Sequence, residues 1–478
     1  MSAGGRHDFK SAAAGAVADA KLRKTLRRVS NFLRGLRAKG FDDFPDFEQF
    51  RARARDAKER AVTGLPELLV RFEENCRAAG GLVHYAADAA EACRLVVEIA
   101  ATRGVRRVVK GKSMVTEEIG LNEALEGAGL SVFETDLGEY IVQLAGEKPS
   151  HILSPALHKT RYDVADLFSE KLGRTCDGGN ITELCRIARE TLRQEFLAAD
   201  MGVTGANMLI AETGTVILLE NEGNIRMSTT CPGLHVAVAG MEKIVADMED
   251  MVAVLDLLPR SATSQRMPGY LNLFTGPRKP GEPDGPEELH VIILDNGRSR
   301  LLADPVLRQA LRCVRCSACL NVCPVYMSVG GHAYGGTYPG PIGSILTPGL
   351  SGGEEGADLP HACTQCGACA AVCPVGIDHP RVLLRLREMY PGALNRAEGL
   401  AASTHAFLAA RPGLYRAASS ALRAVDPDLS TILRLPGMKR AAGWGRMRVL
   451  PRFTRPFSKR WKRLARELAA KGGTARGA

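Results

Sequence analysis

Two stretches late in the chain share one cysteine pattern: CVRCSACLNVCP at 313–324 and CTQCGACAAVCP at 363–374. Each reads C-x2-C-x2-C-x3-C-P, which is the run of cysteines that holds [4Fe–4S] clusters in proteins. Three closely spaced thiolates can bind three corners of a cubane cluster, and the fourth corner needs a ligand from elsewhere. The pair of stretches therefore predicts two [4Fe–4S] clusters and a protein that moves single electrons.

The fourth cysteine of each stretch is expected to bind the cluster of the other stretch, as in bacterial-type two-cluster ferredoxins. The proline after it restrains φ and has no N–H, which suits a chain that turns away from the cluster. Disulfides suit small secreted scaffolds, and zinc usually takes C-x2-C pairs separated by a long gap, so neither alternative matches this pattern. The expected ligands are Cys313, Cys316, Cys319 and Cys373 for one cluster, and Cys363, Cys366, Cys369 and Cys323 for the other.

The composition is that of a globular protein with more than one domain. The chain has 478 residues, of which 45% are hydrophobic and 24% charged, and this length exceeds one ordinary domain. No apolar run approaches the roughly 18 residues that a membrane-spanning helix needs. Arg27-Arg28 lacks the apolar stretch that follows the arginine pair of an export signal, so we expect a cytoplasmic protein.

The net charge of +10 comes from the C-terminal end of the chain. From residue 434 onward there are about fourteen Lys or Arg residues and one acid, Glu467. No nucleic-acid-binding motif accompanies them, so we do not expect nucleic acid as a partner. Phe457, Trp461, Leu464 and Leu468 form one apolar stripe among these cations. The stripe fits a helix on the inner face of the membrane, in a partner's groove or on the protein itself.

Changes in sequence pattern divide the chain into four parts. Residues 1–65 form a helical arm, with apolar residues at helical spacing between residues 22 and 36, and packing on its own globular domain is the favoured interpretation. Residues 66–298 alternate strands and helices, which predicts an α/β domain with a mostly parallel sheet. Residues 299–392 form an α-helical two-cluster ferredoxin-type module, and residues 393–478 a helical basic extension.

Within these parts the pattern predicts individual elements. A Gly- and Pro-rich insert at 330–356 separates the cysteine stretches, and it fits a cover for a cluster, a docking surface or a plain loop. The expected helices of the α/β domain are 88–103 and 115–128, and its expected strands are 82–85, 107–110, 130–133, 207–211, 215–219, 235–238 and 290–294.

Polar residues gather at the ends of several expected strands, where open α/β sheets bind ligands. Lys110-Gly111-Lys112-Ser113 precedes an expected helix, so Lys110 and Lys112 are candidates for holding a carboxylate or phosphate. Glu212 lies in Ala211-Glu212-Thr213-Gly214-Thr215, which fits a site or only a hairpin turn. Pro149-Ser150-His151, with His158 beyond it, is a third polar cluster. Neither G-x-G-x-x-G nor G-x4-G-K-[ST] occurs, so nicotinamide and nucleotide sites lack their usual signatures.

The order of these motifs resembles a known family. K-G-K-S-M-x-x-E-E-I from Lys110, E-T-D-L-G-E-Y from Glu134, A-E-T-G-T from Ala211 and G-G-H-A-Y-G from Gly330 accompany the cysteine stretches. Together they are similar to lactate utilization protein B over roughly residues 60–478. The resemblance implies an α/β lactate-utilization domain whose fold is similar to those of sugar-phosphate isomerases and coenzyme A transferases.

The resemblance also implies a function and partners. It implies an iron–sulfur subunit of a multi-protein system that oxidises L-lactate to pyruvate without a nicotinamide cofactor. A second cysteine-rich iron–sulfur subunit and a smaller subunit with a related α/β domain are the implied partners. The basic C-terminal extension adds a membrane surface, and hence a quinone-linked acceptor, as an expectation.

Three interpretations of the chemistry stay open. In the first, this chain relays electrons and a partner oxidises the substrate. In the second, the α/β domain oxidises the 2-hydroxy acid, with Lys110 or Lys112 holding the carboxylate and Glu212 or a nearby histidine as general base. In the third, the chain serves another quinone-linked oxidoreductase. The lack of a hydride-accepting signature favours the relay, because [4Fe–4S] clusters take electrons one at a time.

Overall fold

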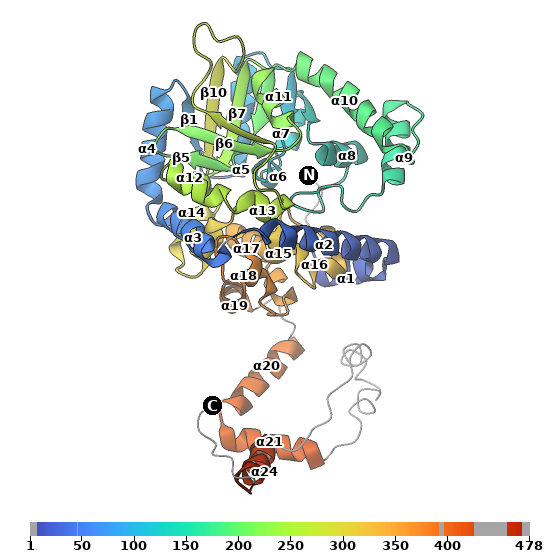
Figure 1. The fold of residues 1–478 in the computed structure, drawn as a ribbon, viewed down its shortest axis with the longest axis vertical. Helices are drawn as coiled ribbons and strands as arrows, with labels where there is room; N and C mark the ends of the chain where they lie inside the picture. Colours follow the sequence, from blue (N-terminus) through green and yellow to red (C-terminus); the bar gives the residue numbers. More distant parts are fainter. Residues whose placement is uncertain (1–6, 45, 392–395, 425–456, 471–478) are drawn as a thin grey trace. The chain divides into compact units, whose positions relative to one another are not determined.

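The structure is a computed structural model, and it describes residues 7–44, 46–391, 396–424 and 457–470 (Figure 1). Residues 1–393 form one compact unit and residues 394–478 a second. The division of the chain into the four parts given above stays a prediction.

A six-stranded sheet lies at the centre of the first unit, and all its neighbouring strands are parallel (Figure 1). The strand order is β1-β10-β7-β4-β2-β3, so the predicted α/β class with a mostly parallel sheet is confirmed. Every one of these strands except β4 was predicted from the sequence. The bounds are β1 (Leu82–Ala86), β2 (Arg107–Lys110), β3 (Ser131–Glu134), β4 (Met201–Thr204), β7 (Leu234–Gly240) and β10 (Glu288–Leu294).

The neighbouring interior strands β7 and β10 supply two different cores. Val236 and Ile292 point to one face of the sheet, where they pack with α5 (Ala89–Thr102) and α7 (Leu121–Gly127). Ala237 and Val291 point to the other face, where they pack with α4 (Leu65–Ala78) and a second sheet. Successive side chains of a strand face opposite sides, so a sheet covered on both faces needs apolar residues throughout.

The second sheet has four strands in the order β8-β5-β6-β9. β5 and β6 form an antiparallel hairpin, and Gly214 at its turn has a φ of 67°. Thr213-Gly214-Thr215 is therefore the hairpin turn that the simpler interpretation predicted. The pattern did not predict the short strand β8 or the edge strand β9. The bounds are β5 (Met208–Ile210), β6 (Thr215–Glu220), β8 (Ile244–Val245) and β9 (Tyr270–Phe274).

The predicted helix at 115–128 is two helices, α6 (Met114–Glu118) and α7. Gly120 stands between them with a φ of 65°, a conformation that interrupts a helix and that glycine adopts at little cost. The other helices around the two sheets are α8 (Leu137–Ala145), α9 (Arg161–Leu172), α10 (Ile181–Ala198), α11 (Asn224–Thr230), α12 (Met248–Leu255), α13 (Leu258–Thr263) and α14 (Arg298–Ala303), with the short 3-10 helix η1 (Met241–Lys243).

The N-terminal segment folds as three helices, α1 (Phe9–Ala18), α2 (Ala20–Phe41) and α3 (Phe47–Thr63). They pack on the rest of the first unit: α2 contacts α13 and two helices of the ferredoxin-type module, and α3 contacts α12 (Figure 1). Leu26 on the apolar side of α2 is only 1% exposed. The prediction that this arm packs on its own globular domain is therefore confirmed.

Short helices build the ferredoxin-type module around the two cysteine stretches. The insert between the stretches is not a plain loop, because it contains the buried helix α17 with Pro348 inside it. The elements are η2 (Leu307–Arg312), α15 (Ala318–Asn321), α16 (Tyr326–Val329), η3 (His332–Tyr334), α17 (Gly340–Ser351), η4 (Leu359–Ala362), α18 (Ala368–Val372) and α19 (His379–Met389).

The second unit contains α20 (Arg396–Ala409), α21 (Pro412–Ala424) and α24 (Phe457–Ala470). Trp461 and Leu464 of the predicted apolar stripe are about half exposed on α24, at 48% and 46%. The side chains of Phe457 and Leu468, and the basic residues at 434–456 and 471–478, lie outside the described residues. Within the part of the chain that the structure describes, no helix is long and apolar enough to cross a membrane.

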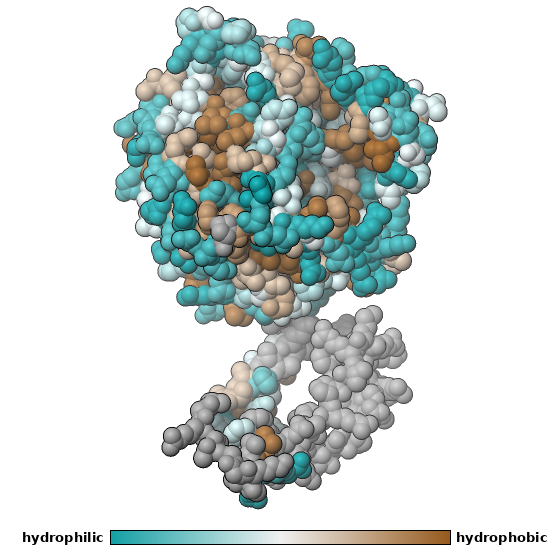
Figure 2. All heavy atoms as spheres, viewed as in Figure 1, coloured by the Kyte–Doolittle hydropathy of each residue, from teal (hydrophilic) through white to brown (hydrophobic). Residues whose placement is uncertain are grey.

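Apolar side chains also reach the surface of the first unit. Figure 2 shows them interspersed with hydrophilic ones on the face that carries β6 and α12. Leu273 of β9 and Val252 of α12 are among the exposed ones, at 44% and 42%. Such scattered apolar residues are normal for a folded protein surface.

Candidate cluster sites and the acidic cleft beside them

The two cysteine stretches have the same backbone conformation. In each, a 3-10 helix ends just before the first cysteine, and a short α-helix carries the third. Between them, Arg315 and Gln365 occupy equivalent positions with left-handed φ values of 60° and 59°. Non-glycine residues adopt this region rarely, so its occurrence at both positions indicates that the two loops share one backbone conformation.

This conformation turns backbone donors toward sulfur. The N–H of Arg315 donates to the Cys313 Sγ at 3.4 Å, and the N–H of Gln365 donates to the Cys363 Sγ at 3.3 Å. The N–H of Ile377 donates to the Cys373 Sγ at 3.4 Å. Hydrogen bonds to the ligand sulfurs stabilise the negative charge of an iron–sulfur cluster. The loops therefore fit the group that the cysteine pattern predicts.

The fourth cysteine of each stretch lies among the first three of the other. Burial, together with the nearby thiolates of Cys373 and Cys313, raises the pKa of Cys316 to about 12. Burial and the thiolates of Cys363 and Cys366 likewise raise the pKa of Cys323 to about 11. This proximity supports the crossed ligand sets, which stay a prediction. Iron would displace the thiol protons, because only thiolates ligate metal.

Three arginines approach the loops from outside the cysteine stretches. Arg37 of α2 and Arg51 of α3 donate to the carbonyls of Val372 at 3.1 Å and Ala370 at 2.8 Å. Arg387 of α19 donates to the Cys363 carbonyl at 2.6 Å. Their positive charges offset the negative charge of thiolate-bound clusters. The N-terminal arginines were not predicted, because some 300 residues separate them from the cysteines.

A single metal ion needs several ligand side chains that converge on one point, unlike a cubane cluster. No group of three His, Cys, Asp or Glu side chains is arranged to hold one ion in the described residues. In a [4Fe–4S] cluster each thiolate binds a different iron atom, so the four sulfurs need not converge on one point.

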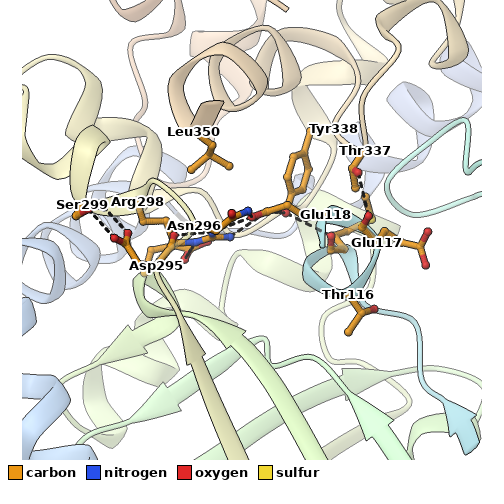
Figure 3. A network of polar contacts seen from close by, with 12 residues as sticks. Thr116, Glu117, Glu118, Asp295, Asn296, Arg298, Ser299, Thr337, Tyr338 and Leu350 are labelled. Atoms are coloured by element: carbon orange, nitrogen blue, oxygen red, sulfur yellow. Dashed lines mark hydrogen bonds and ion pairs between the residues drawn. The ribbon is translucent and has the colours of Figure 1, made fainter. Parts of the chain in front are cut away.

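A closed set of buried polar contacts joins the sheet to the first cysteine loop, and we call it the buried ionic ring. Figure 3 shows the part of it that contains Tyr338, Glu118 and Arg298. Tyr338 donates to Glu118 at 2.6 Å, and Arg298 binds Glu118 through both terminal nitrogens at 2.9 and 3.0 Å. Arg298 also donates to Glu242 at 2.5 Å, and Arg315 reaches the other oxygen of Glu242 at 3.0 Å. The Arg315 guanidinium lies 4.9 Å from the Tyr338 ring centre, which closes the ring.

The ring fixes the charge of its members. Burial raises the pKa of Glu242, but the charges of Arg298 and Arg315 outweigh burial and lower it to about 2. Burial likewise raises the pKa of Glu118, but the charge of Arg298 outweighs burial and lowers the pKa, so Glu118 stays ionised. Since Glu242 follows β7, and Arg298 begins the helix after β10, the ring attaches the carboxyl end of the sheet to the first cluster site.

Lys110 and Lys112 follow β2 at the same end of the sheet. Lys110 is fully buried, and its Nζ lies 2.6 Å from Glu134 and 2.8 Å from Glu117. Burial alone would lower the pKa of Lys110, but the two carboxylates raise it. Lys112 Nζ lies 4.0 Å from Glu139 and has no hydrogen-bond partner among the described residues. Lys110 is therefore held by two carboxylates, whereas Lys112 has all three of its donors unused in the described residues.

The histidines that the sequence singled out lie near this end of the sheet, and Glu212 does not contact it. Burial and the charge of Lys112 lower the pKa of His151 to about 3. His151 Nδ1 accepts two backbone N–H bonds at 3.1 Å, so the proton of the neutral ring is on Nε2, which makes it a donor. His158 is bound to Glu147 at 2.6 Å. Glu212 is exposed beside the β5–β6 turn, where its carboxylate accepts from the N–H of Met248 at 3.4 Å.

A cavity of about 1550 Å³ opens between α6–α8 and the insert of the ferredoxin-type module. We call it the acidic cleft, because eleven Asp and Glu residues line it and its basic lining residues are Lys148 and His7. The cleft was not predicted from the sequence, since its acids come from three segments far apart in the chain: Asp8, residues 117–147 and residues 354–358. The aromatic residues Tyr334 and Tyr338 form part of its wall. Its acidic residues are Asp8, Glu117, Glu118, Glu123, Glu126, Glu134, Glu139, Glu147, Glu354, Glu355 and Asp358.

Comparison with known families matches both halves of the first unit. Residues 69–294 match the LUD domain, and residues 309–377 match the 4Fe-4S dicluster domain. The second match covers both cysteine stretches, so the protein is a two-[4Fe–4S] iron–sulfur protein.

Curated relatives are similar over most of the chain. An uncharacterized electron transport protein, YkgF, of Escherichia coli K12 is 41% identical over 86% of this chain and 86% of its own length. Lactate utilization protein B of Shouchella clausii is 41% identical over 84% of each chain. Lactate utilization protein B of Geobacillus thermodenitrificans is 40% identical over 91% of this chain and 90% of its own.

A solved structure, a DUF162 family protein from Deinococcus radiodurans, is 18% identical and covers 48% of this chain and 98% of its own, with a TM-score of 0.28. That score is too low to bear on the fold. The identities to the curated relatives extend through both the α/β domain and the cysteine stretches, and on that basis the chain belongs to the lactate utilization protein B family.

Proposed function

We propose that this chain is the electron-relay subunit of a multi-protein system that oxidises L-lactate to pyruvate. Oxidation of a 2-hydroxy acid to a 2-oxo acid releases two electrons and two protons, and each [4Fe–4S] cluster takes one electron at a time. The crossed pair of cysteine loops carries the proposal, because it brings two one-electron centres close together. The relatives named lactate utilization protein B supply the substrate class.

The α/β domain has features that oppose oxidation of lactate on this chain. The acidic cleft would repel an anionic substrate, and a carboxylate moved there from water would also lose its hydration. Lys110, one of the two predicted carboxylate holders, is already bound by Glu117 and Glu134. The histidine nearest to Lys112 is a neutral donor and cannot act as the base. These observations favour oxidation of the substrate on a partner.

One observation supports the alternative, in which the α/β domain binds the 2-hydroxy acid itself. Lys112 Nζ is a buried donor without a hydrogen-bond partner in the described part of the chain, and His151 beside it is a second buried donor. Two such donors suit a carboxylate. In this alternative they hold the substrate, and Glu212 has no part in the reaction.

The partners belong to the same proposal. A second cysteine-rich iron–sulfur subunit and a smaller subunit with a related α/β domain would complete the system. The basic helix α24, with Trp461 exposed on it, fits contact with the inner face of a membrane and a quinone-linked acceptor. Identification of the proteins that copurify with the tagged chain, and of their flavin or iron content, tests this part.

Anaerobic reduction of the purified chain tests the relay. With both clusters reconstituted, dithionite should bleach the visible absorbance, whereas L-lactate alone should leave it unchanged. Addition of an extract that contains the partners should then restore lactate-dependent bleaching. Reduction of the clusters by L-lactate without any partner would contradict the relay-only role and support oxidation of the substrate on the α/β domain. In that case Lys112→Met should abolish the reaction, while Glu212→Gln should leave it intact.

A further inference from the structure

The inner end of the acidic cleft contains buried acceptors that have no donor. Glu134 Oε2, Glu139 Oε1 and Asn122 Oδ1 have no hydrogen-bond partner among the described residues, and all three residues line the cleft. Glu134 and Glu139 are only 2% and 3% exposed. A buried acceptor without a donor costs roughly 1–3 kcal/mol, so Glu134 Oε2 and Asn122 Oδ1 call for a ligand that brings N–H donors. A bound cation would also displace the proton that Glu139 holds at neutral pH.

The charge of the cleft specifies the same kind of ligand. Eleven acidic residues line it, and the basic residues of the lining are Lys148 and His7. Cations behind the wall offset part of this charge: Lys110 pairs with Glu117 and Glu134, Arg298 with Glu118, and Lys159 with Glu147. Glu123, Glu126, Glu354 and Glu355 on the outer part are exposed and have no such partner inside the described cleft lining. An ammonium or guanidinium group matches both the charge and the missing donors, whereas a carboxylate matches neither.

The size of the cleft favours a polypeptide over a small molecule. Its volume of about 1550 Å³ exceeds the roughly 300–1,000 Å³ of typical small-molecule sites. Its lining runs from the N-terminal segment at His7 and Asp8, across the insert, to Met389 at the end of α19. We propose that the acidic cleft is the docking site for a basic segment of a partner polypeptide, whose Lys or Arg side chains reach Glu134 and Glu139.

The position of the cleft explains why a partner of an electron-transfer protein would bind there. Tyr334 lines the cleft, and burial together with the thiolates of Cys323 and Cys363 raises its pKa. Tyr334 therefore lines the cleft and also lies close enough to Cys323 and Cys363 for their charges to act on it. Because this proposal concerns binding of a basic partner, it does not depend on which protein oxidises lactate.

Peptide binding to the full-length, cluster-loaded chain tests the proposal. The probe is a fluorescein-labelled octapeptide of alternating lysine and glycine, followed by fluorescence anisotropy at low ionic strength. Binding should saturate and weaken steeply with added salt, because exposed charges are screened. The same octapeptide with glutamate in place of lysine should not bind.

Charge reversal locates the binding site. Glu354→Lys with Glu355→Lys on the cleft should weaken binding by at least about tenfold. The matched control is Glu67→Lys with Glu74→Lys, two exposed positions of α4 outside the cleft, which makes the same change in net charge. The control should bind within about twofold of the unchanged chain. Equal losses in both variants would overturn the proposal, as would tighter binding of spermine than of the octapeptide.

A second measurement tests the inner end of the cleft. Burial and the carboxylates of Glu134, Glu117 and Asp136 outweigh the nearby charge of Lys112 and raise the pKa of Glu139 to about 8. A cation bound beside Glu139 would lower that pKa, so binding at pH 7 should release protons. Calorimetry in buffers of different ionisation enthalpy should detect this release, and Glu139→Gln should remove it. Proton release that is unchanged in Glu139→Gln would rule out contact with this residue.

Discussion

The backbone N–H of Arg315 donates to the Cys313 Sγ at 3.4 Å, and its guanidinium donates to the Cys313 carbonyl at 3.2 Å. The same side chain reaches Glu242 of the buried ionic ring at 3.0 Å. One residue therefore shapes the first cysteine loop, adds a positive charge beside it and attaches it to the α/β domain. A positive charge stabilises the more negative, reduced form of a cluster.

Arg315→Gln should lower the reduction potential of the first cluster relative to the second. Arg387→Gln is the matched variant, because Arg387 donates to the Cys363 carbonyl of the other loop, and it should lower the potential of the second cluster. Redox titration followed by electron paramagnetic resonance measures both. Equal shifts of both clusters in either variant would contradict this assignment.

The crossed ligand sets predict which cysteines act together. Cys373→Ser should alter the same cluster signal as Cys316→Ser, and Cys323→Ser the same signal as Cys366→Ser. Iron content should fall from about eight to about four atoms per chain when one cluster is lost. Cys185→Ser, at an exposed cysteine of α10, is the control and should retain full iron. If Cys373→Ser matched Cys366→Ser instead, each stretch would hold its own cluster.

Glu139→Gln should stabilise the protein more at pH 8 than at pH 5. The pKa of Glu139 is raised to about 8, so between about 4.5 and 8 the folded state holds a proton that the unfolded state has lost. In that window this group makes stability fall as pH rises, by at most about 1.4 kcal/mol per pH unit. Urea unfolding at several pH values measures the difference, which should grow with pH. A constant difference would show that Glu139 is ionised throughout.

Lys110→Met should destabilise the protein strongly. The Lys110 side chain is fully buried between Glu117 and Glu134, and removal of one partner from a buried ion pair typically costs about 3–5 kcal/mol. Lys112→Met, which breaks no hydrogen bond, is the control and should cost less. Urea unfolding measures both, and addition of Glu134→Gln to Lys110→Met should recover part of the loss. Equal effects of the two lysine variants would contradict the structural role of Lys110.

Gly214→Ala and Glu212→Ala separate the two interpretations of the Ala211–Thr215 motif. A Cβ at Gly214, whose φ is 67°, would lie 2.2 Å from the backbone nitrogen of Cys76, so this change should cost more than about 2 kcal/mol. Glu212→Ala on the exposed side of the turn should stay within about 0.5 kcal/mol. It should also support lactate-dependent growth at the normal rate. If Glu212→Ala were stable but failed to support growth on lactate, Glu212 would have a role in function after all.

The sequence was most informative where spacing reflects covalent or periodic constraints. Four cysteines at fixed intervals reveal a cluster loop in any context, and strands such as β7 and β10 are mostly apolar because both of their faces are covered. The strand β4 was missed, since its sequence Met201-Gly202-Val203-Thr204 contains a glycine and only one strongly strand-forming apolar residue. Gly202 is there for a tertiary reason: a Cβ would lie 1.7 Å from the carbonyl oxygen of Ser228.

The polar residues were predicted less well, because their roles depend on partners distant in sequence. Lys110 looked like a ligand holder, and only the fold shows that Glu117 and Glu134 bind it. No role was predicted for Glu242 or Arg298, although they join the sheet to the first cysteine loop through Arg315. Burial of charge cannot be read from a local pattern. It is decided by the fold, which pairs Lys110 with Glu117 only 7 residues away and Arg298 with Glu242 across 56 residues.

The packing of the N-terminal helices has a consequence for synthesis of the chain. Leu26 of α2 lies 3.3 Å from the Cβ position of Gly330, and the N–H of Phe9 donates to Asp358 at 3.1 Å. Roughly 300 residues separate each pair, so at about 5–20 residues per second α1 and α2 leave the ribosome roughly 15–60 s before their partners exist. During that interval their apolar faces are available to chaperones, and enclosure of the clusters is among the last events of folding.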